Sequence, residues 1–76
     1  MRTFISECLE QCANGPIPLK KMATQLGSTE FLVRRAMHTL RRRGLACYTK
    51  GYDIARATPT GRRWVKNGWH LEDQIQ

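Results

Sequence analysis

The stretch MATQLGSTEFLVRRAMHTLRRRGLA, residues 22–46, contains the end of one predicted helix, a short turn and the whole of a second helix. Gly27 predicts the end of the first helix, because glycine readily adopts the left-handed backbone conformation that closes many helices. Thr29 is a typical N-cap for the second helix, which we expect over about residues 30–43 and which Gly44 ends. Two helices joined by a tight turn are the central prediction from the sequence.

The predicted helix over residues 30–43 has two chemically different faces. At about 100° per residue, four apolar side chains fall together on one face: Val33, Ala36, Met37 and Leu40. The opposite face carries an aromatic ring, an imidazole and two guanidinium groups: Phe31, His38, Arg35 and Arg42. Arg34 and Arg41 lie on one flank of the helix. We therefore expect the apolar face to pack on the domain and the basic face to meet solvent.

The sequence before this stretch predicts further helical structure. Apolar residues at helical spacing, with Thr3 as a cap, predict a helix over residues 4–13. The segment PIP, residues 16–18, predicts an extended turn, because each proline restricts its own φ and the conformation of the residue before it. A short helix over residues 19–27 then leads into the tight turn.

The sequence after the basic helix changes from helix-forming to strand-forming. Residues 45–57 read LACYTKGYDIARA, in which β-branched and aromatic residues surround the dipeptide KG; this pattern predicts a hairpin with a two-residue turn. Thr58 as N-cap and Pro59 at the first helical position predict a last helix, which we expect to end at residues 67–68.

The predicted order is helix, helix, tight turn, helix, hairpin, helix. Residues 22–46 contain five features in order: an apolar-Ala pair, a Leu-Gly turn, a Ser/Thr cap, the motif Val-Arg-x-Ala and the pair Gly-Leu. In this order they resemble the pattern of GntR-like and related bacterial or phage transcriptional regulators. Residues 58–65, TPTGRRWV, resemble the Thr-Pro-x-Gly segment that follows the wing in many such proteins. The resemblance implies an α+β winged helix-turn-helix fold, with a three-helix core, a two-stranded β-hairpin wing and a C-terminal helix. We expect one domain over residues 1–68 and a tail over residues 69–76 that offers a dimer contact.

The net charge of +7 is distributed unevenly along the chain. Residues 1–33 are neutral overall, whereas residues 34–66 carry ten lysines and arginines against Asp53 alone. Such an asymmetry is the electrostatic signature of a polyanionic partner. A generally basic, solvated surface is the alternative, and charge alone does not separate the two.

The sequence argues against several other classes of protein. Cys8 and Cys12 are four residues apart and share one face of the predicted helix, where they form either a pair of metal ligands or part of the apolar core. We favour the core, because a zinc site needs four ligands and the other candidate ligands are scattered along the sequence. The chain lacks paired carboxylates, a nucleophile beside a base and a glycine-rich phosphate loop, so we expect neither an enzyme nor a cofactor, metal or small-molecule ligand. No apolar run approaches the roughly 20 residues that span a bilayer, and we see no signal peptide, so we expect no membrane association and a cytoplasmic location.

The basic helix can enter the major groove of double-stranded DNA with its N-terminal half near the base edges. The residues predicted to contact DNA are Thr29, Glu30, Phe31, Arg34, Arg35, His38, Arg41, Arg42, Lys50, Arg62 and Arg63. Among them, Arg34, Arg35 and His38 are candidates for base or phosphate contacts, since an arginine fork matches the O6 and N7 of guanine.

The three residues at the start of the basic helix have different expected roles. Thr29 can hydrogen-bond a phosphate. Glu30 can accept from a cytosine amine or simply repel non-specific DNA. Phe31 can touch a thymine methyl group, or it packs on the preceding helix or on a dimer partner.

The remaining basic residues are expected to hold the DNA backbone. Arg41, Arg42 and Lys50 contact phosphates in this hypothesis, with Lys50 at the wing tip beside the minor groove, and Arg62 and Arg63 extend the basic patch. One such module buries only about 600–1,000 Å², so we expect a homodimer on an inverted repeat. The expected function is a sequence-specific double-stranded-DNA-binding transcriptional regulator, such as a repressor. The alternative is a small protein-binding adaptor or inhibitor of the phage type.

Overall fold

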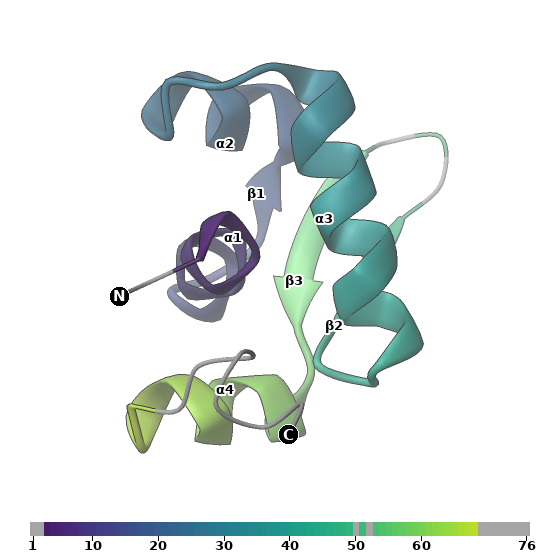
Figure 1. The fold of residues 1–76 in the computed structure, drawn as a ribbon. Coiled ribbons are helices and arrows are strands. Elements are labelled where there is room, and N and C mark those ends of the chain that lie inside the picture. Colours follow the sequence, from purple (N-terminus) through teal and green to yellow (C-terminus); the bar gives the residue numbers. More distant parts are fainter. Residues whose placement is uncertain (1–2, 50, 52, 69–76) are drawn as a thin grey trace.

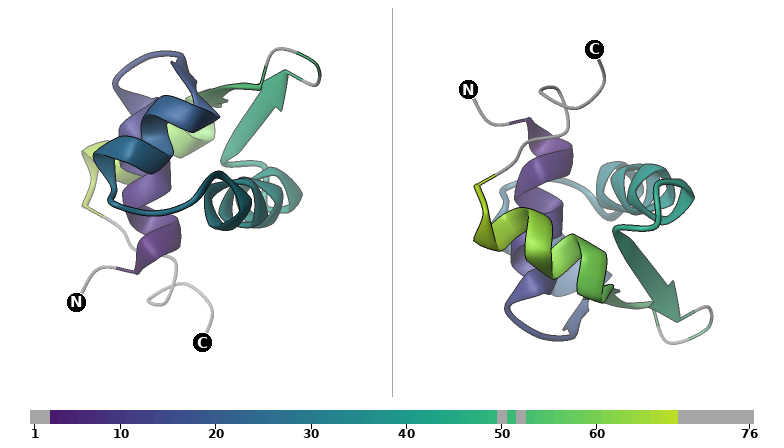
Figure 2. Two further views of the ribbon diagram at one scale, coloured as in Figure 1. Left: turned by 90° about the horizontal axis from the view of Figure 1, so that it is seen from above. Right: turned by 90° about the horizontal axis from the view of Figure 1, so that it is seen from below.

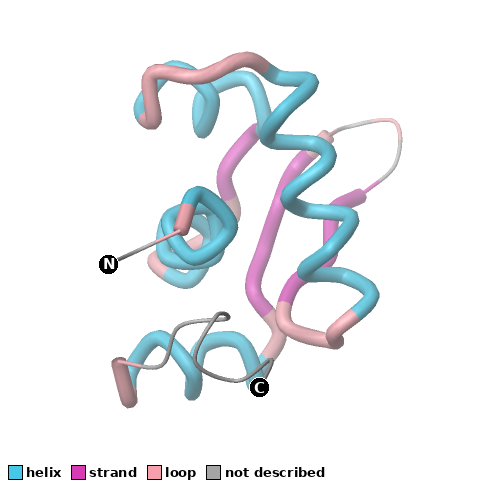
Figure 3. The backbone as a smooth tube through the Cα atoms, viewed as in Figure 1, coloured by secondary structure: helices cyan, strands magenta, loops and turns pink. Residues whose placement is uncertain are grey.

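The structure is a computed structural model and describes residues 3–49, 51 and 53–68. In chain order the elements are α1 (Phe4–Ala13), β1 (Ile17–Pro18), α2 (Leu19–Gln25), α3 (Glu30–Arg42), β2 (Ala46–Thr49), β3 (Ile54–Ala57) and α4 (Pro59–Lys66) (Figure 1). In this view α2 and α4 lie on opposite sides of α1 (Figure 1). The strands lie beside α1 and α3, with α1 packed on β3 and α3 packed on β2 (Figure 3).

Three of the helices begin at a threonine that caps the first turn. The hydroxyl oxygens of Thr3, Thr29 and Thr58 each accept from the main-chain N–H three residues later, at 3.0 to 3.2 Å. This contact satisfies one of the N–H groups that a helix start leaves without a partner. The caps confirm the predicted starts of α1, α3 and α4.

The turn between α2 and α3 closes as its glycine predicted. Gly27 has a φ of +63°, in the left-handed region. The Ser28 N–H then donates to the Ala23 carbonyl at 2.8 Å, which satisfies one of the last carbonyls of α2. The chain therefore turns sharply enough for α2 and α3 to pack against each other.

The sheet has three strands, whereas the sequence predicted a two-stranded hairpin. The strand order is β1-β3-β2, and both pairings are antiparallel. In the added pairing Ile17 faces Ala55 and Pro18 faces Ile54. Pro18 has no N–H to donate, and its place on an edge strand makes that loss tolerable. The predicted extended conformation of this segment is confirmed, but a two-residue strand is too short to show a strand pattern in the sequence.

The two strands of the wing, residues 46–57, are joined by a longer loop than predicted. The pairing of Thr49 with Ile54 leaves positions 50–53 between the strands, so the expected two-residue turn at Lys50 and Gly51 is wrong. The Asp53 N–H donates to the Thr49 carbonyl at 2.8 Å, and Asp53 has a φ of +54°. Aspartate tolerates this left-handed conformation, which lets the fourth loop residue close the hairpin.

One apolar core unites α1, α2, α3 and the sheet. Its fully buried side chains include Leu19, Met22 and Leu45, together with the apolar face of α3. Cys8 and Cys12 belong to this core, as predicted, with 0% and 2% of each residue exposed. Burial raises the pKa of the Cys8 thiol to about 12 and that of the Cys12 thiol to about 11. Both residues therefore act as small apolar groups.

α4 approaches the rest of the domain through a glycine. A Cβ on Gly61 would overlap the carbonyl oxygen of Leu45 and lie 2.8 Å from its carbonyl carbon. The Thr58 hydroxyl donates to the Gly44 carbonyl at 2.7 Å, and the Thr58 N–H donates to the Leu45 carbonyl at 3.1 Å. These contacts hold the start of α4 against the turn that follows α3, and Trp64 and Val65 pack against the core.

Two predictions fall on residues that the structure does not describe. These are the tail over residues 69–76 and the wing-tip residue Lys50. Within the described ranges, none of the helices combines the length and apolar character needed to cross a bilayer.

Candidate nucleic-acid interface

α3 separates its side chains into the two faces that the helical wheel predicted. Val33, Met37 and Leu40 are 0% exposed and Ala36 is 4% exposed. α1, α2 and β2 pack around this apolar side, and they fix the orientation of the helix. The opposite side faces solvent (Figure 2).

The predicted contact residues of α3 gather on this solvent-facing side. Arg35, His38, Arg41 and Arg42 are exposed, and Arg34 is half-buried. The whole set comes from one helix, which the wing flanks (Figure 2). The structure therefore brings the central part of the predicted site together on one side of α3. We call this surface the basic face of α3.

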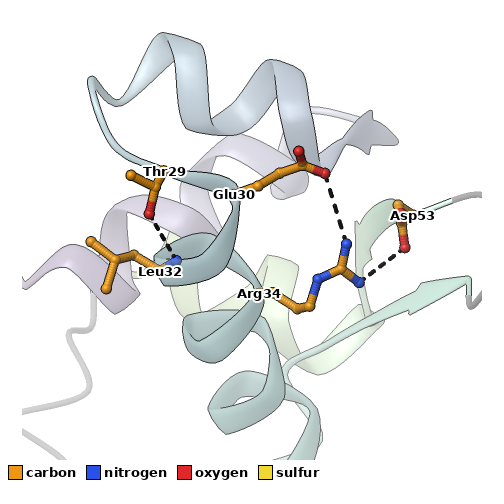
Figure 4. A network of polar contacts seen from close by, with 5 residues as sticks. All are labelled: Thr29, Glu30, Leu32, Arg34 and Asp53. Atoms are coloured by element: carbon orange, nitrogen blue, oxygen red, sulfur yellow. Dashed lines mark hydrogen bonds and ion pairs between the residues drawn. The ribbon is translucent and has the colours of Figure 1, made fainter.

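Arg34 differs from the other arginines because it has carboxylate partners within the domain. Its Nη1 donates to Asp53 Oδ1 at 3.0 Å, and its Nη2 lies 3.8 Å from Glu30 Oε1. The guanidinium thus bridges the first turn of α3 and the wing (Figure 4). The hydrogen bond with Asp53 raises the pKa of Arg34 and lowers the pKa of the Asp53 carboxyl. Both shifts show that the two groups favour their charged forms at neutral pH.

Asp53 is a functional candidate that the sequence reasoning missed. Its side chain binds Arg34, its N–H donates to Thr49, and its carbonyl accepts from the Leu19 N–H at 2.8 Å. One residue therefore connects the wing to α3 and to the start of α2. The sequence does contain a signal for it: Asp53 is the single acidic residue in residues 34–66, which carry ten lysines and arginines.

Thr29 and Glu30 use their side chains within the domain. The Thr29 oxygen accepts from the Leu32 N–H at 3.2 Å, which leaves its hydroxyl proton to donate (Figure 4). Glu30 lies beside Arg34 and suits the positive end of the helix dipole. Their predicted contacts with DNA stay predictions, and both residues have a structural role as well.

Phe31 is exposed rather than buried against the preceding helix. The residue is 66% exposed, and the Arg35 guanidinium carbon lies 5.8 Å from the centroid of its ring. This separation is within the range of a cation–π contact. Phe31 and Arg35 also line a shallow hollow of about 340 Å³ that continues to His38 and Tyr48.

Arg62 and Arg63 lie apart from the basic face of α3. They belong to α4, which extends away beneath α1 and packs on it (Figures 1 and 2). Arg62 Nη1 donates to the Ala57 carbonyl at 3.4 Å, which directs this side chain toward its own domain. The structure therefore does not join these two arginines to those of α3, and their predicted DNA contacts remain untested.

Metal ligands do not cluster in the described part of the chain. Within residues 3–49, 51 and 53–68, no three residues of the His, Cys, Asp and Glu types lie close enough together to hold an ion. The free thiols Cys8 and Cys12 are instead enclosed by apolar side chains.

Comparison with known proteins gives a likeness in fold alone. No protein-family model and no curated protein matches the chain. Two solved structures of ZitR variants from Lactococcus lactis match it with a TM-score of 0.71 each. The structure of a ZitR variant with two substitutions is 18% identical in sequence to this chain, and the match covers 87% of this chain and 49% of the ZitR chain. The structure of a variant with one substitution is 17% identical, and the match covers 99% of this chain and 56% of the ZitR chain. The chain thus spans about half the length of these structures. With the helix-turn-helix and the wing already described, the likeness shows that the chain has the winged-helix fold.

Proposed function

We propose that this protein is a double-stranded-DNA-binding regulator of transcription whose α3 enters the major groove. One observation carries the proposal: the buried side of α3 is closed by Val33, Met37 and Leu40, while its opposite side presents cations to solvent. A helix held in this way fits a groove about 12 Å wide. The winged-helix fold, which the likeness to the ZitR structures shows, supports this class of function.

The positions of the side chains suggest a division of roles. Arg35 and His38 lie on the N-terminal and central turns of α3, where recognition helices approach base edges. Arg41 and Arg42 lie on the last turn and suit phosphates. Arg34 is held between two carboxylates, so the role supported by its geometry is to position the wing.

The finer parts of the proposal concern specificity and assembly. We propose a repressor of the GntR-like type, of bacterial or phage origin, that binds as a homodimer to an inverted repeat. Half-sites would then be about one helical turn apart. Sedimentation of the protein alone and with a duplex tests this assembly, and a single monomeric species in both samples would contradict it.

The first experiment measures binding to DNA of random sequence. A labelled duplex of random sequence is titrated at several salt concentrations, and binding is followed by fluorescence anisotropy. With about five phosphates neutralised, the logarithm of affinity should fall with log salt at a slope of roughly −4 to −5.

A pair of charge-matched variants makes this experiment specific to α3. Arg41→Ala should weaken binding, whereas Lys21→Ala should leave it nearly unchanged. Lys21 is exposed on α2 but faces the turn between α1 and β1. Equal losses in both variants would mean that net charge, and not the basic face of α3, binds the DNA. Absence of binding at low salt would favour the protein-binding adaptor instead.

A further inference from the structure

Phe31 and Arg35 form a pair on the exposed side of α3. We propose that this pair acts as one unit that recognises two neighbouring base pairs, one through a thymine and the other through a guanine. The inference rests on the proposed function and deepens it by naming the base step that the site selects.

The geometry of the helix brings the two side chains together. Phe31 and Arg35 are four residues apart on α3 and therefore share one face. Side chains in a helix lean toward its N-terminus, so Arg35 extends back over the ring of Phe31. The guanidinium carbon lies 5.8 Å from the ring centroid, which is a cation–π contact.

The chemistry of the pair matches two different bases. A guanidinium fork can donate to both O6 and N7 of guanine, and an apolar side chain can contact the C5-methyl group of thymine. Successive bases are about 3.4 Å apart along the helix axis. The Arg35 guanidinium and the Phe31 ring, which are 5.8 Å apart, are therefore within reach of two neighbouring base pairs.

The surroundings of Arg35 indicate that Phe31 is what holds it. Among the described residues Arg35 has no carboxylate partner, in contrast to Arg34 with its two. A guanidinium already oriented by the ring loses less conformational freedom when it binds a base. Phe31 is also 66% exposed, and a partner that covers this apolar ring removes it from water. Both observations favour a common ligand for the pair.

The test begins with selection of bound duplexes from two random-sequence pools. One pool contains thymidine, and the other contains deoxyuridine in its place, which removes only the methyl group. The protein should select a thymine beside a guanine from the first pool. From the second pool it should still select the guanine, but it should lose most of its preference for one base at the neighbouring pair. The reason is that burial of one methyl group corresponds to a factor of about four in affinity.

Variants assign the two bases to the two side chains. Phe31→Ala should lose the thymine preference, and Arg35→Ala should lose the guanine preference. Leu32→Ala is the matched control, because it removes an exposed apolar side chain from the same turn, and it should select the same step as the unaltered protein. All three residues are exposed, and circular dichroism checks that each variant stays folded.

A double-variant cycle on the selected duplex tests whether the pair is a unit. If Phe31 orients Arg35, the double variant should lose clearly less affinity than the product of the two single losses. Multiplicative losses would overturn the coupling. A selected sequence without the thymine, or one unchanged in the deoxyuridine pool, would overturn the base step while leaving DNA binding intact. Selection of no duplex at all would overturn both the inference and the proposed function.

Discussion

Arg34 of α3 and Asp53 of the wing are joined by a hydrogen bond of 3.0 Å between Nη1 and Oδ1. Asp53 adopts a φ of +54°, and its carbonyl accepts from the first residue of α2. The side chain of Asp53 therefore links the wing to α3, and its carbonyl links the wing to the start of α2.

Replacement of Asp53 by asparagine should alter the response of stability to acid. Arg34 holds the pKa of Asp53 below its ordinary value of 3.8, so the stabilising effect is complete above that pH and is lost as the pH falls further. Asparagine tolerates the left-handed backbone and removes only the charge. The urea concentration at the midpoint of unfolding is measured for both proteins between pH 7 and pH 2.5. The unaltered protein should have the higher midpoint, and the difference between the two midpoints should shrink below about pH 4. An advantage that does not depend on pH would refute the ion pair.

The salt dependence of DNA binding should distinguish Arg34 from Arg42. Each phosphate contact contributes about 0.9 to the slope of log affinity against log salt, so Arg42→Ala should reduce the slope by about that amount. Arg34 is already neutralised by Asp53 and should release fewer counterions, so Arg34→Ala should change the slope less than half as much. Equal changes would mean that Arg34 leaves Asp53 to bind a phosphate, as the sequence alone suggested.

Gly61→Ala should destabilise the domain, because the new methyl group overlaps the carbonyl of Leu45. Overpacking of this kind costs about 1–3 kcal/mol. Thr60→Ala, at the exposed neighbouring position of α4, should cost much less. The free energies of unfolding of both variants are measured by urea titration, and similar values would show that α4 does not dock closely on this turn.

The three cysteines should differ in their reaction with a maleimide at pH 8. Cys47 is exposed and should be labelled within minutes. Cys8 and Cys12 are buried, with pKa values raised to about 12 and 11, so they hold almost no thiolate at this pH. Mass spectrometry of the native protein should show one label, and unfolding in guanidinium chloride should give three. Two or more labels in the native protein would contradict the packing of α1.

The helices of this protein are encoded locally. Thr29 caps α3, Gly27 closes α2 shortly before it, and Val33, Ala36, Met37 and Leu40 recur on one face. Each of these signals depends only on residues within one or two turns of the helix. The exposed position of Phe31, Arg35 and His38 follows from the same periodicity, which is why the central part of the candidate site was predictable.

The sequence predicted least where the conformation of a single residue or a contact between distant segments decides the structure. The pairing of β1 with β3 joins Ile17 to Ala55, and a two-residue strand carries no alternation that could indicate it. The wing loop was predicted too short, because the left-handed Asp53 closes it in place of the expected KG turn. Arg62 and Arg63 share the charge of α3 but not its surface, since the direction of α4 depends on its contact with α1.

The sequence by itself determined where most of the helices begin and end, which side of α3 is apolar, and how unevenly the charge is distributed. Hydrogen bonding and side-chain periodicity act over a few residues, so a single chain states them directly. Only the tertiary structure decided that Arg34 is bound to Asp53, that Arg35 lies over Phe31 without a carboxylate partner in the described residues, and that Gly61 meets Leu45. Packing sets which side chains become neighbours, and it thereby distinguishes arginines that the sequence presents as equivalent.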